Sequence, residues 1–245
     1  MYIQILITVI GIILLAVYIK EKIKGASLNA LILKSLVSCC FLAAALSALL
    51  TTWPEGSADT AALCFPVLVI FGLFCGLMGD IWLDLKLVYP ADDAPYTYAG
   101  FIFFAVGHVF FISGLIKGYG AGIRPWMILA AFAAAVLLGI LTVLAGPLLG
   151  LNYGRFRTIS MIYAPLLIST TLISLVLVLH NGLSVHVPVI MFVGGALFLL
   201  SDLVLSGTYF GEGKDRPIDI ILNYVFYYGA QFLIAWAAIA SCARY

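Results

Sequence analysis

Long apolar stretches separated by short polar segments dominate the pattern of the chain. Eight of these stretches are long enough, at roughly 17–25 residues, to cross a hydrocarbon core of about 30 Å as helices. They fall at about 2–18, 28–50, 62–85, 98–116, 125–145, 158–180, 186–209 and 219–242. Unpaired backbone groups are too costly in lipid, so each stretch is predicted to be an α-helix. The pattern therefore predicts an all-α integral membrane protein with eight transmembrane helices, in which residues 1–245 form a single polytopic domain.

Composition favours the membrane class and excludes a soluble one. Hydrophobic residues make up 64% of the chain and charged residues 9%, with a mean hydropathy of +1.19. Soluble domains are about 25% charged. The net charge of +1 argues against a polyanionic partner, so no nucleic acid is expected. The five cysteines lie in apolar stretches without the spacing of metal ligands, and we interpret them as small hydrophobic residues.

The distribution of basic residues predicts the orientation of the chain in the membrane. The first, third, fifth and seventh loops contain Lys20, Lys22, Lys24, Lys86, Arg155, Arg157, Lys214 and Arg216. The other loops and the ends of the chain contain Lys117, Arg124 and Arg244. Cytoplasmic loops carry an excess of Lys and Arg, so both termini are predicted outside, in what we expect to be a bacterial inner membrane. The first stretch is expected to remain as a membrane helix, because basic residues follow it and none precedes it.

Carboxylates interrupt two of the apolar stretches. Phe71–Leu85 contains Asp80 and Asp84, which an i, i+4 spacing puts on one helical face, and Gly194–Ser206 contains Asp202. A carboxylate inside a membrane helix is costly and by default marks a functional site. Both stretches match a pattern of a small residue, Asp, two residues and Leu, which indicates a four-plus-four internal repeat.

Small residues and further polar residues complete this picture. Gly72, Gly76 and Gly79 allow another helix to approach closely. The predicted orientation puts the aspartates at a similar depth to Lys34, His108, Tyr163, Asn223, Tyr224, Tyr227, Tyr228 and Gln231. Because nearly all membrane-embedded polar groups share this depth, we expect a polar cavity toward the cytoplasmic side.

The aspartates admit a structural and a functional interpretation. Asp80 and Asp202 can each be satisfied by a hydrogen bond between helices, for example to Tyr224 or Lys34. Alternatively, two carboxyls that share a low-dielectric cavity cannot both ionise easily, which leaves a protonated acid beside an ionised base. Asp84 is expected to be a solvated residue at the rim.

The other polar residues leave several interpretations open. His108 is either a buried neutral imidazole bonded to a neighbouring helix, a proton relay or orienter for an aspartate, or a metal ligand. Lys34 can bind a headgroup phosphate, pair with a carboxylate or extend to the interface. Tyr224, Tyr228 and Gln231 share a helical face, and we expect them to line the cavity because their polar atoms need partners in a dry environment.

Taken in order along the chain, several short motifs resemble the YhhN family, the transmembrane lysoplasmalogenases. The matching pieces are Lys34-Ser35-Leu36, Gly72-Leu73, Gly79-Asp80 with Leu83, Gly100, Phe104, Gly107-His108, Tyr163, Gly195-Ala196-Leu197-Phe198, Ser201-Asp202-Leu203 and Tyr227-Tyr228-x-Ala230-Gln231. One departure is Phe111, where the family often has Tyr. The resemblance implies hydrolysis of the sn-1 vinyl ether bond of lysoplasmalogens, with Asp80 and Asp202 as the catalytic pair.

This implied chemistry suits the residues. A vinyl ether hydrates through protonation of its β-carbon, which needs a general acid and a carboxylate to stabilise the resulting cation, with no metal and no cofactor. The expected partner is a lysophospholipid within the membrane. The supporting or substrate-binding residues are Lys34, Asp84, His108, Tyr163, Ser201, Asn223, Tyr224, Tyr227, Tyr228 and Gln231. Two alternatives stay open: a proton-coupled carrier that uses the buried aspartates, and a metal-dependent lipid hydrolase that uses His108 with them.

Overall fold

The computed structural model describes residues 1–25, 27–52, 60–211 and 216–242, and within these ranges the chain forms helices and short connections without any β-strand. The long helices are α1 (Tyr2–Lys24), α2 (Leu28–Thr52), α3 (Thr60–Val88), α4 (Asp93–Tyr119), α5 (Pro125–Leu144), α6 (Arg157–Asn181), α7 (His186–Phe210) and α8 (Pro217–Cys242). Short 3₁₀ turns are η1 (Pro90–Asp92), η2 (Gly146–Leu149) and η3 (Gly154–Phe156). Each of the eight long helices in this described part is apolar and long enough to cross a membrane, which confirms the predicted class of an eight-helix membrane protein.

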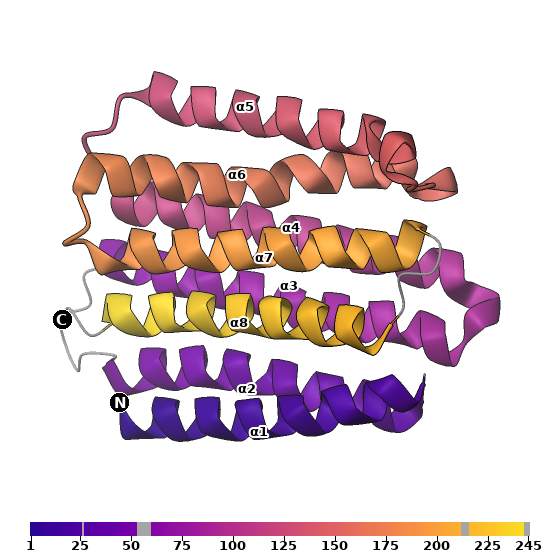
Figure 1. Ribbon diagram of the computed structural model, residues 1–245. Coiled ribbons are helices and arrows are strands. Elements are labelled where there is room, and N and C mark those ends of the chain that lie inside the picture. Colours follow the sequence, from indigo (N-terminus) through magenta and orange to yellow (C-terminus); the bar gives the residue numbers. More distant parts are fainter. Residues whose placement is uncertain (26, 53–59, 212–215, 243–245) are drawn as a thin grey trace.

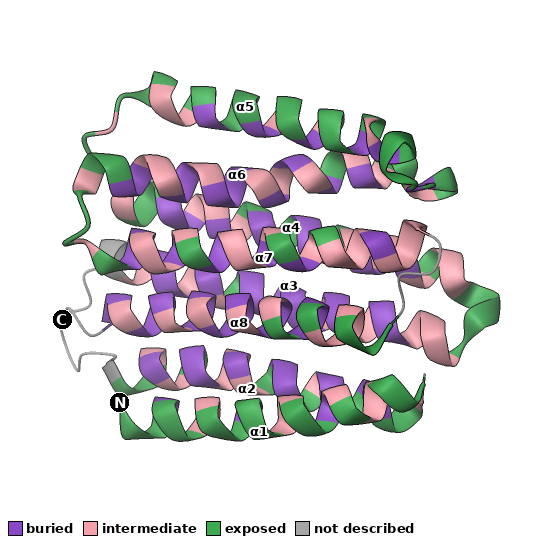
Figure 2. Cartoon of the chain, viewed as in Figure 1, coloured by how far each residue is buried: buried purple, intermediate pink, exposed green. Residues whose placement is uncertain are grey.

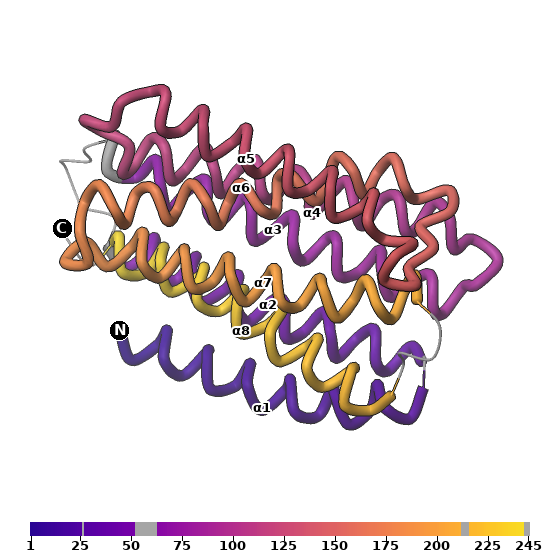
Figure 3. Tube along the Cα trace, turned by 45° about the horizontal axis from the view of Figure 1, so that its top comes forward, coloured from indigo at the N-terminus to yellow at the C-terminus, as the bar shows by residue number. Residues whose placement is uncertain are grey.

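The helices form a bundle with their axes roughly aligned (Figure 1). Helix α8 packs against α7, α2, α3 and α1, while α4 packs against both α3 and α6. Helix α5 packs on α6 at one edge of the bundle, and α1 packs on α2 at the opposite edge (Figures 1 and 3). Because successive helices alternate in direction, α1 begins and α8 ends at the same end of the bundle, and η1 and η3 lie at the other end.

Burial separates the inner helices from the outer ones. Exposed positions are concentrated on α1 and α5, whereas α8 is the most buried helix (Figure 2). The exposed positions of the outer helices are large and apolar, as at Ile12, Ile13, Leu137 and Leu138. An apolar exterior is what a lipid environment requires, so the burial pattern agrees with an integral membrane protein.

Glycines bring α3 and α4 into close contact, as the small-residue spacing predicted. A Cβ atom on Gly72 would lie 3.0 Å from the carbonyl oxygen of Gly107 and would overlap the ring of Phe111. A Cβ atom on Gly79 would lie 2.7 Å from the ring of Phe104. Side chains at these positions would push the two helices apart, which would move the carboxylates that α3 carries.

Two helices extend beyond their predicted limits. Helix α1 continues to Lys24 where the apolar stretch ends near residue 18, and α4 begins at Asp93 where the apolar stretch begins near residue 98. Hydropathy marks where lipid contact ends, but a helix can continue past that point with polar side chains. Lys214 and Arg244, which contributed to the predicted orientation, lie outside the described residues. The orientation and the four-plus-four repeat remain predictions.

Candidate active site

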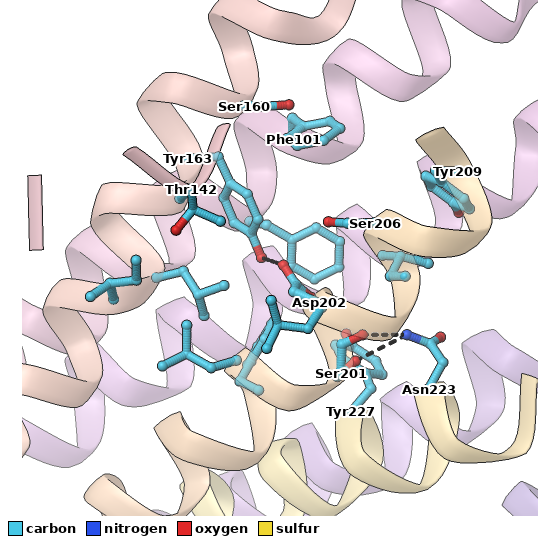
Figure 4. Close-up of a pocket in the computed structure, with 18 of the residues that line it drawn as sticks. Phe101, Thr142, Ser160, Tyr163, Ser201, Asp202, Ser206, Tyr209, Asn223 and Tyr227 are labelled. Atoms are coloured by element: carbon cyan, nitrogen blue, oxygen red, sulfur yellow. Dashed lines mark hydrogen bonds between the residues drawn. The ribbon is translucent and has the colours of Figure 1, made fainter. Parts of the chain in front are cut away.

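A cavity of about 420 Å³ is lined by residues of α2 to α8, and both Asp80 and Asp202 line it. Its other polar lining residues include Lys34, Ser160, Tyr163, Ser201, Asn223, Tyr224 and Tyr227. Figure 4 shows several of these side chains around Asp202. The rest of the lining is mainly leucine and phenylalanine, among them Phe101, Phe104 and Phe198. The two aspartates on α3 and α7, 122 residues apart by their numbers, therefore face one largely apolar space.

Asp80 is held by donors from two other helices. Its side chain is 1% exposed. On α2, Lys34 places its ammonium nitrogen 3.2 Å from Oδ1, and the Ser38 hydroxyl donates to Oδ2 at 2.6 Å. The Tyr227 hydroxyl of α8 also donates to Oδ2, at 2.8 Å. One cation and two hydroxyl donors favour the ionised form of a buried carboxyl.

Asp84 is not the solvated rim residue that was expected. It is 2% exposed, and the Lys22 ammonium lies 3.1 Å from both carboxylate oxygens. Lys34 lies 3.3 Å from Oδ1, and the Tyr18 hydroxyl lies 3.4 Å from Oδ2. The extra turns of α1 bring Lys22 to this position and cover Asp84. The result is a buried cluster of two carboxylates and two ammonium groups, in which Lys34 is shared.

Asp202 has a much simpler environment. The Tyr163 hydroxyl of α6 donates to its Oδ2 at 2.6 Å, as the dashed line in Figure 4 shows. Among the described residues no Lys, Arg or His forms an ion pair with Asp202. Next to it on α7, Ser201 accepts from the Asn223 amide through both its carbonyl oxygen, at 2.9 Å, and its hydroxyl, at 3.2 Å. Asp202 is thus half-buried in the cavity wall, and the described part of the chain gives it one hydroxyl donor and no counter-charge.

His108 lies outside the cavity lining. Its Nδ1 is 2.9 Å from the Thr170 hydroxyl of α6, and its Nε2 is buried without a partner among the described residues. The imidazole packs against Phe198 and Tyr163, and the Tyr163 hydroxyl in turn donates to Asp202. Within the described part of the chain, no three His, Cys, Asp or Glu side chains are grouped so that they could hold a metal ion.

The polar residues of α8 divide into two groups. Asn223, Tyr224 and Tyr227 line the cavity. Tyr228 and Gln231 do not, contrary to expectation: the Tyr228 hydroxyl contacts Ser38 and the Lys34 carbonyl, both at 3.2 Å, and Gln231 donates to Tyr227 at 3.0 Å. Tyr228 and Gln231 therefore hold residues that in turn contact Asp80, namely Ser38, Lys34 and Tyr227. Tyr228 and Gln231 lie away from the cavity because two adjacent faces of α8 are buried against different neighbours.

A profile of the YhhN family matches residues 29–238, which is most of the chain. The chain belongs to the YhhN family. The matched range includes both aspartates and every candidate site residue from Lys34 to Gln231. No curated protein and no solved structure matches the chain.

Three residues that bind the carboxylates of α3 were not predicted as site residues: Tyr18, Lys22 and Ser38. Ser38 lies one helical turn after Lys34, so i, i+4 spacing could have identified it. Tyr18 and Lys22 have the same spacing on α1, but they precede the residues that the family profile matches. Lys22 was counted only as a loop charge, because the first apolar stretch ends before it.

The cavity also reaches the lipid-facing surface of the YhhN chain. Leu138 of α5 and Leu203 of α7 both line it, and both are exposed, by 48% and 60%. Their outer faces carry apolar surface of the kind that meets lipid. Apolar side chains therefore lie between the cavity and the outer surface at these positions.

Proposed function

We propose that this YhhN protein is a lysoplasmalogenase that hydrolyses the sn-1 vinyl ether bond of lysoplasmalogens. The products are a fatty aldehyde and glycerophosphoethanolamine or glycerophosphocholine. The observation that carries the proposal is the pairing of two aspartates with opposite surroundings in one apolar cavity. Membership of the YhhN family supports the reaction class.

Asp202 is the general acid in this proposal. A carboxyl without a counter-charge in an apolar cavity is favoured in its protonated form. Tyr163 donates to Oδ2, which leaves Oδ1 to hold a transferable proton. Transfer of that proton to the β-carbon of the vinyl ether forms a C–H bond and leaves an oxocarbenium ion at the adjacent carbon.

Asp80 is the ionised partner. Its charge, held by Lys34, Ser38 and Tyr227, stabilises the oxocarbenium ion, and it accepts a proton from the water that attacks this cation. The attack forms a hemiacetal. When its C–O bond breaks, Asp80 returns its proton to the glycerol oxygen and Asp202 takes the hydroxyl proton of the hemiacetal, which releases the aldehyde and the glycerol hydroxyl and restores both aspartates. Fixed donors around Asp80 need no reorganisation as the cation develops, which is the main advantage of a preorganised site.

The cavity suits a single-chain lipid. Phenylalanine and leucine side chains form most of its wall, and the exposed Leu138 and Leu203 connect it with the lipid-facing surface. A lysolipid presents one hydrocarbon chain beside a polar glycerol, and the cavity lining likewise combines a mainly apolar wall with a few polar groups, among them the two aspartates.

The test is release of fatty aldehyde by the detergent-purified protein from lysoplasmenyl-ethanolamine, beside the matching 1-acyl lysolipid and with EDTA present. We expect aldehyde from the vinyl ether, no hydrolysis of the acyl ester, and no effect of EDTA. Loss of activity with EDTA would favour the metal-dependent hydrolase. Absence of aldehyde from a folded sample would overturn the proposal and favour the proton-coupled carrier.

A further inference from the structure

A second, smaller pocket adjoins the cavity where α3 ends and α4 begins. Its volume is about 290 Å³, and its lining includes Lys86, Asp93, Asn152 and Arg155. Tyr153, Tyr209 and Phe210 line both this pocket and the cavity. The two spaces therefore share a wall of aromatic side chains, with polar groups on one side and an apolar space on the other.

Lys86 lines this pocket, and its ammonium group has too few polar partners for a buried charge. Its side chain is 10% exposed, and its ammonium nitrogen lies 3.4 Å from the centroid of the Tyr209 ring. The nearest carboxylate oxygen belongs to Asp93 at 4.0 Å, which is too long for a hydrogen bond. Within the described residues the structure gives Lys86 no hydrogen-bond acceptor. A nearly buried ammonium group without an acceptor is unfavourable unless a ligand supplies one.

The other charges of the pocket have both signs. Arg155 donates to Oδ2 of Asp93 at 2.7 Å, and its side chain is 58% exposed, so part of its guanidinium remains open to a ligand. Asp93 is 39% exposed. Two cations and one carboxylate around one small space suit a zwitterion, with a phosphate beside the cations and an amine beside the carboxylate.

We propose that this pocket binds the zwitterionic phosphodiester headgroup of the lysolipid, with Lys86 and Arg155 on the phosphate and Asp93 on the amine. This inference rests on the proposed function and adds a headgroup site to it. Lys86 lies six residues beyond Asp80 on α3, about 9 Å along the helix axis. A glycerol backbone would span this interval, with the vinyl ether between the aspartates and the headgroup at Lys86.

Lys34 is excluded from this role by its contacts. It lies 3.2 Å from Asp80 and 3.3 Å from Asp84, so both neighbouring carboxylates already compete for its charge. Tyr153, which precedes η3, lies in the aromatic wall that separates this pocket from the cavity. Burial raises the pKa of Tyr153, so its hydroxyl stays a neutral donor at the junction of the two spaces.

The test measures binding of two uncleavable ligands to the full-length protein in detergent. One is the saturated sn-1 ether analogue of lysoplasmenyl-ethanolamine, and the other is the corresponding alkylglycerol, which lacks the headgroup. We expect Lys86→Gln to weaken binding of the first about tenfold and to leave the second unchanged. Lys117→Gln, the same change at the exposed far end of α4, is the matched control and leaves both unchanged. Because neither ligand is hydrolysed, the result stands whether or not aldehyde is released in the activity assay.

Two further variants and a competition experiment test the same pocket. If Lys86→Gln fails to fold, Arg155→Gln, at a position that is 58% exposed, should weaken binding of the ethanolamine analogue in the same direction. Asp93→Asn should reduce the preference for a phosphoethanolamine over a phosphoglycerol headgroup. Equal weakening of both ligands by Lys86→Gln, or no weakening of either, would overturn the headgroup site. Competition by inorganic phosphate as strong as that by glycerophosphoethanolamine would also overturn it, because it would indicate a free-phosphate site.

Discussion

Asp80 and Asp202 have matching neighbours in the sequence and opposite neighbours in the fold. Asp80 receives a cation and two hydroxyl donors within 3.2 Å, whereas Asp202 receives one hydroxyl donor at 2.6 Å. Both line the same cavity. The comparison teaches that a shared local motif does not fix the chemistry of a carboxyl, because its protonation is decided by groups that other helices bring to it.

The difference follows from which helices surround each aspartate. Helix α3 lies between α2, α4 and α8, so Asp80 meets Lys34 and Ser38 on one side and Tyr227 on another. Helix α7 packs between α6 and α8, and the residue of α6 that faces Asp202 is Tyr163. If the two halves of the chain descend from a repeat, the described residues provide a lysine partner for Asp80 in the first half and none for Asp202 in the second.

The largest expected effect is on turnover in Asp202→Asn. Loss of the general acid should lower kcat about 1,000-fold. The amide still accepts the hydrogen bond from Tyr163 and loses no charged partner, so the unfolding temperature should stay close to that of the parent. Asp92→Asn makes the same change at an exposed position and serves as the control. Turnover within tenfold of the parent would contradict the assignment of the acid.

The next prediction concerns stability and tests the cluster around Asp80. Lys34→Met leaves two buried carboxylates with only Lys22 as a cation, and breaking such a cluster should cost about 3–5 kcal/mol in the free energy of unfolding. Adding Asp80→Asn restores charge balance, because Lys22 and Asp84 then remain as one pair. The double variant should therefore be more stable than Lys34→Met alone, measured by denaturant unfolding in detergent micelles. A double variant less stable than Lys34→Met would show that the lysine does not balance Asp80.

A smaller effect on turnover is expected when Tyr163 or Tyr227 is replaced by phenylalanine, and the two losses should differ. Tyr163→Phe removes the one described hydrogen-bond donor of Asp202 and should lower kcat about tenfold. Tyr227→Phe leaves Asp80 with Lys34 and Ser38, so its effect should be about threefold. Single-turnover rates with saturating substrate give the comparison directly. Equal losses would argue that the two carboxyls are supported alike.

The smallest effect is expected at His108. It bonds to Thr170 and does not line the cavity, so His108→Gln should change kcat by no more than about twofold and stability by about 1 kcal/mol. Thr170→Val removes the same hydrogen bond from the other side and should behave similarly. A large loss of kcat in His108→Gln with normal stability would instead give the imidazole a role in proton transfer.

The helices themselves could be predicted from the chain because span length and apolarity are local properties. The close approach of a helix to α3 could also be predicted from its glycines, but only the fold shows that the neighbour is α4 at Gly72 and Gly79 and α8 at Gly76. The rim position expected for Asp84 was wrong for a non-local reason. Its cover comes from Lys22, on a part of α1 where the apolar pattern has already ended.

The sequence by itself determined that this is an eight-helix membrane protein of the YhhN family with aspartates inside its spans, because hydrophobic run lengths and motif order are read along one dimension. Only the tertiary structure decided that Asp80 and Asp202 face one cavity, that Lys34 is shared between two carboxylates, and that Lys86 has no hydrogen-bond acceptor among the described residues. These facts depend on which faces of distant helices meet. Electrostatic interactions in a low-dielectric interior act over a few ångströms in space, whatever the separation in the chain.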